Sequence, residues 1–344
     1  MAARGRNVMK ASFIQWNFFD MLIEVVLFFC GLGLLYAGAE LLVGSASRIA
    51  LLLKVAPIVV GLTVVAFGTS SPEFLVSFMA ALRGQIDVAV GNIVGSNIAN
   101  IGLVLAFSTL LRPIRRIMAN IKEELIWVLA ATLLFWFFAS DNVFVWYEGA
   151  ILTLGIFLFT GILIRQSIRD RNLSAEDVPP VETRWHWLDR QTKVIKMILF
   201  SIGVVAGIAV LSWGSRLTID SAVSIAAHLG VSQIVIGLTM VAFGTSLPEL
   251  ATGIISVVKK ENEILVGNVI GSNLFNILGV AGPIALFFNI PVREHALVFD
   301  FPVMMVFTIL LFVALWVYKS LNRLFGFLFF AAYISYILYT IWAG

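Results

Sequence analysis

The sequence predicts an all-α polytopic membrane protein with ten transmembrane helices, arranged as two inverted-topology repeats of five helices each. Three observations carry this prediction: an apolar composition, hydrophobic runs of membrane-spanning length, and an internal repeat. The chain has 344 residues, of which 60% are hydrophobic and 12% are charged, and its mean hydropathy is +1.00. A soluble domain carries about 25% charged residues. The composition therefore excludes a soluble enzyme, a disordered protein and a coiled coil, and the single cysteine, Cys30, excludes a scaffold of intrachain disulfides.

Ten apolar runs are long enough to cross a bilayer. A spanning helix needs about 20 apolar residues, and such runs form helices because a helix satisfies its own backbone hydrogen bonds in lipid. Residues 1–21 form a polar N-terminal stub without the plan of a signal peptide, so no cleaved segment is expected. The predicted spans are residues 22–44, 56–81, 88–111, 123–140, 145–165, 195–217, 233–257, 264–288, 297–318 and 324–342.

The longest polar stretch, residues 166–192, is predicted to be a hydrophilic linker. It contains Pro179-Pro180 and mixed charges, and it separates the first repeat (residues 22–165) from the second (residues 193–344). With ten spans, 17 of the 23 lysines and arginines fall on the side of the linker. The positive-inside rule therefore places the linker in the cytoplasm and both termini outside. The expected location is the plasma membrane, of the cell inner-membrane type, as a multi-pass protein.

Two motifs recur at a constant offset of 176 residues. GLTVVAFGTSSPE at 61–73 and GLTMVAFGTSLPE at 237–249 are identical at eleven of thirteen positions. At the same offset, GNIVGSNIAN at 91–100 aligns with GNVIGSNLFN at 267–276. Each repeat contains five predicted spans, an odd number, so the second copy enters the membrane from the opposite side. Inverted repeats are a recurring plan of secondary transporters, whose substrates bind near the midplane where the halves meet.

The first motif places one glutamate in the hydrocarbon layer in each repeat. Glu73 lies about 24 Å along its helix if that helix begins near Pro57, and Glu249 occupies the equivalent depth. A carboxylate at this depth indicates an ion or proton pathway. A proline precedes each glutamate and frees the backbone carbonyl four residues earlier, at Gly68 and Gly244, so each helix is expected to be kinked or opened at its acidic residue. Hydroxyls lie within one turn, at Thr69, Ser70, Thr245 and Ser246. An oxygen-only ligand set favours a hard cation such as Ca²⁺, and Na⁺ is expected to suit it too.

The second motif places small and polar residues along one face of a helix. Asn92, Ser96 and Asn100 share a face because they are four residues apart, and the second repeat has Asn268, Ser272 and Asn276. Glycine pairs lie beside these stripes and allow close helix packing, at Gly91, Gly95, Gly267 and Gly271. Packing alone would explain any one of these small residues. It does not explain an acid beside a proline at midspan in both repeats.

The paired motifs resemble the two α-repeats of the sodium/calcium exchanger family, in the calcium/cation antiporter superfamily. The resemblance extends over the whole chain, and the short linker is similar to that of prokaryotic members. It implies cation sites between the second, third, seventh and eighth helices. Carried over by position, it implies the metal ligands Glu73, Glu249, Ala66, Thr69, Ser70, Ala242, Thr245, Ser246, Ser96, Ser272, Asn100 and Asn276.

The resemblance implies a secondary antiporter that exchanges Na⁺ for Ca²⁺ by alternating access and uses no cofactor. Two ionised glutamates balance one Ca²⁺ or two Na⁺, and a further Na⁺ in serine-lined outer sites would make the cycle electrogenic. Some members, including the potassium-dependent branch, have an aspartate at the position of Asn276, so potassium cotransport is not expected. The expected partners are the lipid bilayer and the transported ions, with no nucleic acid.

Three other functions fit the sequence less well. A proton/calcium antiporter of the same superfamily typically has a GN-x-x-E motif where this chain has GTSSPE and GTSLPE. A passive cation channel needs a continuous wet path, which a closed two-fold cage does not favour. An intramembrane enzyme needs an Asp pair, a Ser–His pair or a metal motif, and no such motif is visible, so we expect a transporter rather than an enzyme.

Overall fold

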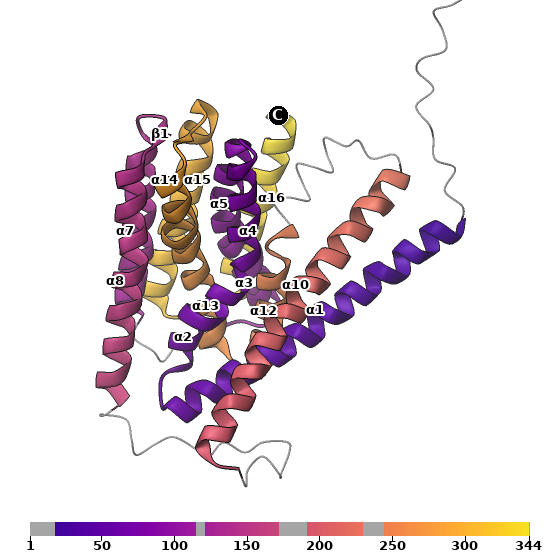
Figure 1. The fold of residues 1–344 in the computed structure, drawn as a ribbon, viewed down its shortest axis with the longest axis vertical. Coiled ribbons are helices and arrows are strands. Elements are labelled where there is room, and N and C mark those ends of the chain that lie inside the picture. The colour runs from indigo at the N-terminus through magenta and orange to yellow at the C-terminus, as the bar shows by residue number, and fades with distance from the viewer. Residues whose placement is uncertain (1–17, 115–120, 172–190, 230–243, 344) are drawn as a thin grey trace, which may run out of the picture.

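The computed structural model describes residues 18–114, 121–171, 191–229 and 244–343, and nearly all of these are helical (Figure 1). Elements labelled η are π-helical turns. The first repeat contains α1 (Phe18–Leu53), α2 (Pro57–Val60), η1 (Gly61–Val65), α3 (Ala66–Thr69), α4 (Ser71–Leu82), α5 (Ile86–Ala99), η2 (Asn100–Leu105), α6 (Ala106–Leu111), α7 (Lys122–Ala139), β1 (Val143–Phe144) and α8 (Trp146–Arg171). The second contains α10 (Lys193–His228), α12 (Leu247–Val258), α13 (Asn262–Leu274), η3 (Phe275–Ala281), α14 (Gly282–Phe287), β2 (Ile290–Pro291), η4 (Ala296–Asp300), α15 (Phe301–Val313), η5 (Ala314–Tyr318) and α16 (Arg323–Ala343).

The all-helical polytopic fold is confirmed, whereas the number of ten spans stays a prediction. Seven helices of the described part are long and apolar enough to cross a membrane, and the bent pair Pro57–Thr69 and Ser71–Leu82 makes an eighth. The predicted span 123–140 coincides with α7, whose 18 residues begin with Lys122 and two glutamates. Of the predicted span 233–257, the structure describes only the part from residue 244 onward, which contains the 12-residue helix α12.

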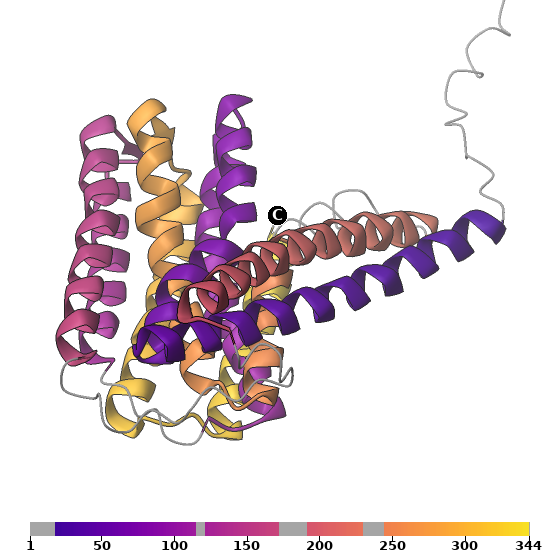
Figure 2. The ribbon, with the colours of Figure 1, turned by 60° about the horizontal axis from the view of Figure 1, so that its bottom comes forward.

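The first helix of each repeat is much longer than the sequence predicted. α1 and α10 each contain 36 residues, against predicted spans of 22–44 and 195–217. A helix of this length extends about 54 Å, and the hydrocarbon layer is about 30 Å thick, so both helices must cross it obliquely or extend beyond it. Figure 2 shows them side by side and strongly inclined to the rest of the bundle. A hydropathy window finds the apolar stretch of such a helix and misses its polar extensions.

Glycines let α1 and α10 pack with their backbones in contact. A Cβ at Gly38 would lie 2.7 Å from the backbone nitrogen of Leu211, and one at Gly214 would lie 2.8 Å from that of Leu35. We call the line of contact between the two helices the glycine seam, and its four glycines are Gly31, Gly38, Gly207 and Gly214. The two glycines of each helix are seven residues apart, and the offset of 176 relates one pair to the other. Close approach of this kind is the usual role of small residues between membrane helices.

The hydrophobic core is divided into two clusters. The larger cluster joins the helices of the main bundle, from Ile58 to Tyr333. The smaller one lies along α1 and α10 and includes Leu42, Val204 and Leu211, with Ile255 and Ile264 as its links to α12 and α13. The α1–α10 pair therefore has a core of its own and rests on the main bundle through a limited surface.

Two short backbone pairings join the repeats and follow the same two-fold relation. β1 pairs with β2 in antiparallel fashion, with Phe144 opposite Ile290, and an isolated bridge pairs Ile114 with Leu321. The offset of 176 relates Ile114 to Ile290, and it relates Phe144 to Leu321 within one residue. Each repeat thus donates the same element to the other.

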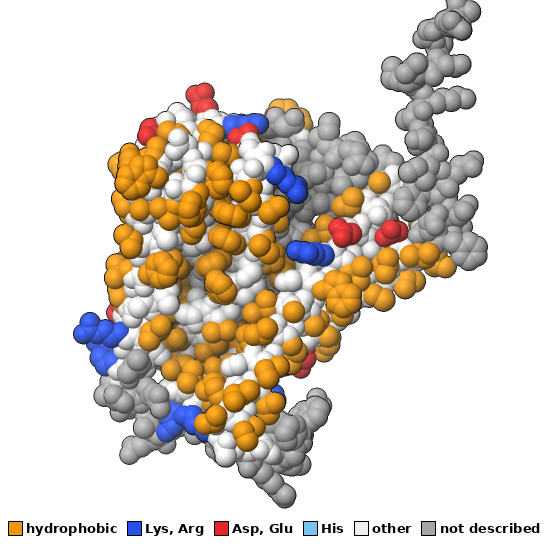
Figure 3. Space-filling view, viewed as in Figure 1, with side chains coloured by type: hydrophobic (Ala, Val, Ile, Leu, Met, Phe, Trp, Pro, Cys, Tyr) orange, Lys and Arg blue, Asp and Glu red, His pale blue; other side chains and the backbone are white. Residues whose placement is uncertain are grey.

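The visible surface of the bundle is that of a protein surrounded by lipid. Figure 3 shows hydrophobic side chains over most of this face, with Lys and Arg near its lower edge and also at its top and right-hand side. Large apolar side chains point outward along the helices, among them Phe137, Phe157 and Leu154, which are 67–71% exposed. Such a surface is unfavourable in water and favourable in a bilayer.

Candidate cation site

Each glutamate of the first motif lies just after a break in its helix. α3 ends at Thr69 and α4 begins at Ser71, with a bend of 42° between the two parts of the span. Ser70 has φ −87° and ψ 5°, and its counterpart Ser246 has φ −86° and ψ 3°. Pro72 and Pro248 follow in the first turn of α4 and α12, where a missing N–H costs nothing. The two breaks are therefore equivalent, and each positions a glutamate in the first turn of the following helix.

The two breaks bring the carboxylates together in the interior. Glu73 and Glu249 are each only 1% exposed, and they are close enough to interact electrostatically. Ser70 Oγ donates a hydrogen bond to Glu249 Oε1 at 3.0 Å, across the interface between the repeats. In the described part of the chain no cluster of three or more His, Cys, Asp or Glu residues could hold a metal ion, so these two acids provide the charge of the site.

The backbone carbonyls around the breaks are partly engaged. Gly244 O, one of the two carbonyls predicted to be freed by a proline, accepts a hydrogen bond from Ser215 Oγ of α10 at 3.0 Å. The carbonyl of Ala66 accepts the N–H of Ser70 at 3.0 Å and has the hydroxyl of Thr69 as a second, longer donor at 3.5 Å. Ala242 lies outside the described residues.

The second motif lies in two helices that turn π-helical at the centre of the protein. η2 begins at Asn100, and η3 includes Asn276 as its second residue. π-helical turns are frequent at functional sites because they displace the side chains of the following residues. Asn92, Ser96 and Asn100 lie along one buried face, as do Asn268, Ser272 and Asn276, and all six are at most 3% exposed.

Seven side-chain oxygens of the predicted ligands are buried without a hydrogen-bond partner among the described residues. Unsatisfied buried polar atoms are costly and rare in native proteins, so a concentration of them indicates a place for a ligand or water. The seven atoms are Glu73 Oε2, Glu249 Oε2, Ser96 Oγ, Ser246 Oγ, Ser272 Oγ, Asn100 Oδ1 and Asn276 Oδ1.

Hydrogen bonds between asparagines and threonines connect the repeats around these atoms. Thr69 Oγ1 donates to Asn268 Oδ1 and Thr245 Oγ1 donates to Asn92 Oδ1, each at 3.2 Å. Asn100 Nδ2 donates to Asn273 Oδ1 at 3.0 Å. Asn92 and Asn268 were noted in the sequence as members of a polar face. Asn273 was missed, although the motif GSN shows it at the same position in both repeats.

One of the two predicted glycine pairs has its packing role confirmed. A Cβ at Gly267 would lie 2.6 Å from Ile58 O, and one at Gly271 would lie 2.5 Å from Leu62 O, so α13 rests directly on the backbone of α2 and η1. Neither Gly91 nor Gly95 has a described atom within 4 Å of such a Cβ. By the repeat relation their partner segment falls in residues 230–243, which lie outside the described residues.

The fold and this site together define a class of protein: a helical membrane transporter with two related halves around paired carboxylates. The family model for sodium/calcium exchanger proteins matches residues 23–165 and 199–342, one match in each repeat. The chain belongs to the sodium/calcium exchanger family, and it is a membrane antiporter of the sodium/calcium exchanger type.

Individual relatives match between 76% and 92% of this chain. CaxA of Alkalimonas amylolytica is 40% identical over 268 residues, which are 76% of this chain and 80% of CaxA. The inner membrane protein YrbG of Escherichia coli (strain K12) is 35% identical over 303 residues, 86% of this chain and 90% of YrbG. A solved structure of the sodium-calcium exchanger NCX_Mj, soaked with Na⁺ and Sr²⁺, superposes with a TM-score of 0.78 at 30% identity and covers 92% of this chain and 98% of that one.

Proposed function

We propose that this chain exchanges Na⁺ for Ca²⁺ by alternating access, with both ions bound where the two repeats meet. The observation that carries the proposal is the set of seven buried oxygens without a hydrogen-bond partner among the described residues, two from the Glu73 and Glu249 carboxylates and five from serines and asparagines of the two motifs. Oxygen ligands with two negative charges suit Ca²⁺. The proposed ligands are Glu73, Glu249, Ala66, Thr69, Ser70, Ala242, Thr245, Ser246, Ser96, Ser272, Asn100 and Asn276.

Charge balance supplies the coupling between the two ions. Two ionised carboxylates neutralise one Ca²⁺ or two Na⁺, and a buried charge is tolerated only when it is paired. The same pair cannot hold Ca²⁺ and a full sodium load at once, so one ion must leave before the other binds. A further Na⁺ at Ser96 or Ser272 gives the sodium-loaded form a net positive charge, which makes the cycle electrogenic.

The moving part is the α1–α10 pair. The pair has its own core, a glycine seam holds its two helices together, and Ile255 and Ile264 link that core to the main bundle. Sliding of the pair over the bundle would open the site to one side of the membrane and then to the other. Discrete rearrangement of rigid packed units is the usual form of such transitions.

The proposed orientation follows from the charge distribution of the sequence. The two inverted repeats, residues 22–165 and 193–344, would be joined by a cytoplasmic linker at 166–192, and the stub at 1–21 would lie outside. The protein would reside in the plasma membrane, with Na⁺ and Ca²⁺ as substrates and no cofactor.

Radiolabelled calcium uptake into proteoliposomes tests the proposed function. Uptake should follow an outward sodium gradient, and an outward proton gradient without sodium should drive little. Acid pH should slow exchange on both faces, because a protonated glutamate no longer balances Ca²⁺. Robust uptake driven by a pH gradient in sodium-free vesicles would replace this proposal with proton/calcium antiport, and uptake without any counter-ion would indicate a channel.

A further inference from the structure

Asn92 is held from three directions in the first repeat. Its Nδ2 donates to the backbone carbonyl of Glu73 at 3.2 Å and to Ser77 Oγ at 2.9 Å, both on α4. A carbonyl can only accept, so the nitrogen of the amide must face α4 and its oxygen must face the other way. That oxygen accepts the hydroxyl proton of Thr245, from the second repeat, at 3.2 Å. All three side chains are buried, with Ser77 at 0% and Asn92 at 3% exposed.

We propose that Ser77 and Asn92 are positioning residues that aim the hydroxyl oxygen of Thr245 at the cation. A hydroxyl that binds a cation must give its proton to another acceptor, so that its lone pairs face the ion. Asn92 Oδ1 is that acceptor, and Ser77 fixes the amide that carries it. The proposal rests on the proposed function, because it assumes that Thr245 is a ligand.

The second repeat lacks this arrangement. Asn268 Oδ1 accepts from Thr69 Oγ1, but Asn268 Nδ2 has no hydrogen-bond partner in the described chain. The counterpart of Ser77 is Gly253, which offers no hydroxyl. Its Cβ would lie 2.9 Å from Ser108 Oγ and from Val104 Cγ1, so α6 and η2 occupy the place of that side chain. The amide that accepts from Thr245 is therefore held more firmly than the amide beside Thr69, whose hydroxyl also has Val65 O as an acceptor at 3.1 Å.

Ser77→Ala tests the role of the hydroxyl, and Ser77→Thr is its conservative partner. In sodium-driven calcium uptake, Ser77→Ala should raise the half-saturating Ca²⁺ concentration about 3- to 10-fold, the effect of one lost hydrogen bond, with little change in maximal rate or melting temperature. Ser77→Thr should restore it. Thr132→Val, which deletes a buried hydroxyl bonded only to its own helix at Val128 O, is the control and should leave the half-saturating concentration unchanged.

A double-mutant cycle separates positioning from a general effect. Measured by calcium binding, Ser77→Ala should add little to Thr245→Ala, because both changes remove the same ligand. Additive losses, or equal impairment of Ser77→Ala and Ser77→Thr, would overturn the proposal. Normal binding by Thr245→Ala would instead count against Thr245 as a ligand, and so against the proposed function.

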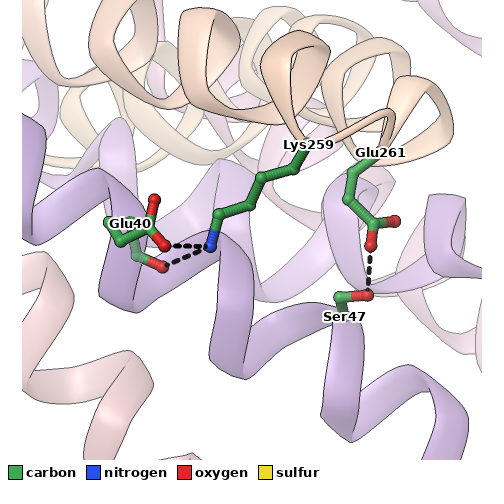
Figure 4. A network of polar contacts seen from close by, with 4 residues as sticks. All are labelled: Glu40, Ser47, Lys259 and Glu261. Atoms are coloured by element: carbon green, nitrogen blue, oxygen red, sulfur yellow. Dashed lines mark hydrogen bonds and ion pairs between the residues drawn. The ribbon is translucent and has the colours of Figure 1, made fainter. Parts of the chain in front are cut away.

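A different observation concerns the turn between α12 and α13, which makes three polar contacts with α1 (Figure 4). Lys259 Nζ lies 2.7 Å from Glu40 Oε1 and donates to Glu40 O at 3.3 Å. Ser47 Oγ donates to Glu261 Oε1 at 2.6 Å. This turn lies at the same end of the bundle as the C-terminus of α8 and the start of α10, the side of the linker. Among the described residues, α1 packs along α12, whereas α10 has no comparable contact with α4.

The geometry points to a set of contacts that holds the site closed on the linker side. We call the contacts of Glu40 with Lys259 and of Ser47 with Glu261 the latch. The repeat relation shows what the reverse closure, of α10 on the turn after α4, would bring together. There Glu40 is replaced by Arg216, Lys259 by Arg83, Ser47 by Val223 and Glu261 by Gln85. The backbone of the two turns is the same, since Lys260 and its counterpart Gly84 have φ of 68° and 70°.

Closure by α1 on the linker side and closure by α10 on the opposite side should therefore differ in stability. Reverse closure offers no hydroxyl at Val223 and places Arg216 beside Arg83. Asp220, in the position of Gly44, gives Arg83 one carboxylate in compensation. The reverse closure can form one ion pair, but it has no counterpart of the Ser47–Glu261 hydrogen bond and it brings Arg216 close to Arg83. The conformation closed on the linker side is therefore favoured. This inference rests on the proposed exchange cycle.

Half-saturating Ca²⁺ measured separately on each face of oriented vesicles tests the latch. Apparent affinity on a face is proportional to the fraction of molecules open to it. Lys259→Gln should lower the half-saturating concentration on the linker side about two- to fivefold, the range expected for a partly exposed ion pair, and raise it slightly on the other. Glu40→Lys combined with Lys259→Glu should restore the wild-type values.

Two outcomes would overturn the latch. Affinities that move in the same direction on both faces would indicate damage to the binding site. If Glu40→Lys combined with Lys259→Glu failed to restore the wild-type half-saturating concentrations, the Glu40–Lys259 ion pair would not be the cause of the shift. The control is Arg293→Gln, which breaks an exposed ion pair with Asp87 away from α1 and α10 and should shift neither face. Absence of calcium transport in the wild type would reject the exchange function itself.

Discussion

At the residue scale, seven oxygen atoms of the proposed site have no hydrogen-bond partner among the described residues. The threonines and asparagines around them are bonded across the repeat interface, which leaves the carboxylates, serines and two amide oxygens turned inward. A preorganised group of this kind binds a cation without first having to break internal hydrogen bonds. The two carboxylates contribute charge and the others mainly shape and dipoles.

Replacing either glutamate by glutamine should abolish exchange. Glu73→Gln and Glu249→Gln each keep the shape and remove one of two charges, and leaving a buried charge uncompensated costs about 3–5 kcal/mol, equivalent to a loss of about 100-fold or more. Sodium-driven calcium uptake checks this, with correct folding shown by size-exclusion chromatography. Glu294→Gln, at an exposed position in the helical turn before η4, should behave as wild type. Near-normal uptake by either site variant would remove that residue from the proposed site.

Because position 276 is an asparagine rather than an acid, calcium exchange should not require potassium. The amide of Asn276 offers an oxygen but no charge, so an additional K⁺ beside two glutamates would be poorly compensated. Calcium uptake should be equal in choline and in potassium media. Asn276→Asp should bind cations more tightly or with greater sensitivity to pH, because a third acid is crowded by the other two. An absolute potassium requirement in the wild type would contradict this account of the central position.

The residue types that form the site could be predicted from sequence, but the hydrogen bonds between them could not. Glu73 and Glu249 are conspicuous because an acid in an apolar run has no packing explanation. The bond between Ser70 and Glu249 and the bonds made by Asn92 and Asn273 depend on how two distant segments meet. The difference between Ser77 and Gly253 gains meaning only once Asn92 is seen to bond with Ser77.

At the element scale, the α1–α10 pair shows the largest departure from prediction. Hydropathy located both helices but shortened them, because it registers apolar content and not helix length. The glycine seam was visible as a spacing of seven residues in both repeats, yet glycine alone does not reveal which helix it faces. The breaks before α4 and α12 were predicted more successfully, since proline has a local effect on its own helix.

Adding one methyl group to the seam should destabilise the protein. Gly38→Ala places a Cβ 2.7 Å from Leu211 N, and overpacking of this kind costs about 1–3 kcal/mol. Gly33→Ala, on the same helix with no atom within 4 Å, is the matched control and should be neutral or stabilising. Thermal unfolding in detergent checks both. Equal melting temperatures would show that the two backbones are not in close contact.

At the scale of the whole molecule, the proposed opposite orientation of the two repeats would give the protein two similar ends. The exchange of β-pairings between the halves and the equivalent helix breaks follow from this relation. In the proposed ten-span topology the charges do not follow this relation, and the excess of Lys and Arg on the linker side distinguishes the two ends. Sequence alone identified the repeat, but the position of α1 against α12 required the structure.

Accessible cysteines should establish the orientation. In a Cys30→Ala background, single cysteines at Ser174, in the predicted linker, and at Asp141, in the exposed turn after α7, should react with membrane-impermeant reagents from opposite sides. The cysteine at 141 should be labelled on intact cells and the one at 174 only after the membrane is opened. Labelling of both on intact cells would contradict the inverted topology.

Equilibrium calcium binding to the purified chain in detergent tests the central claim most directly. Na⁺ should displace radiolabelled Ca²⁺ cooperatively, because more than one Na⁺ must enter to replace a divalent ion between Glu73 and Glu249. Choline at the same ionic strength should displace little, and both glutamine variants should bind little Ca²⁺ at the outset. Calcium binding that is insensitive to Na⁺, or that survives in both variants, would contradict a shared carboxylate site for the two ions.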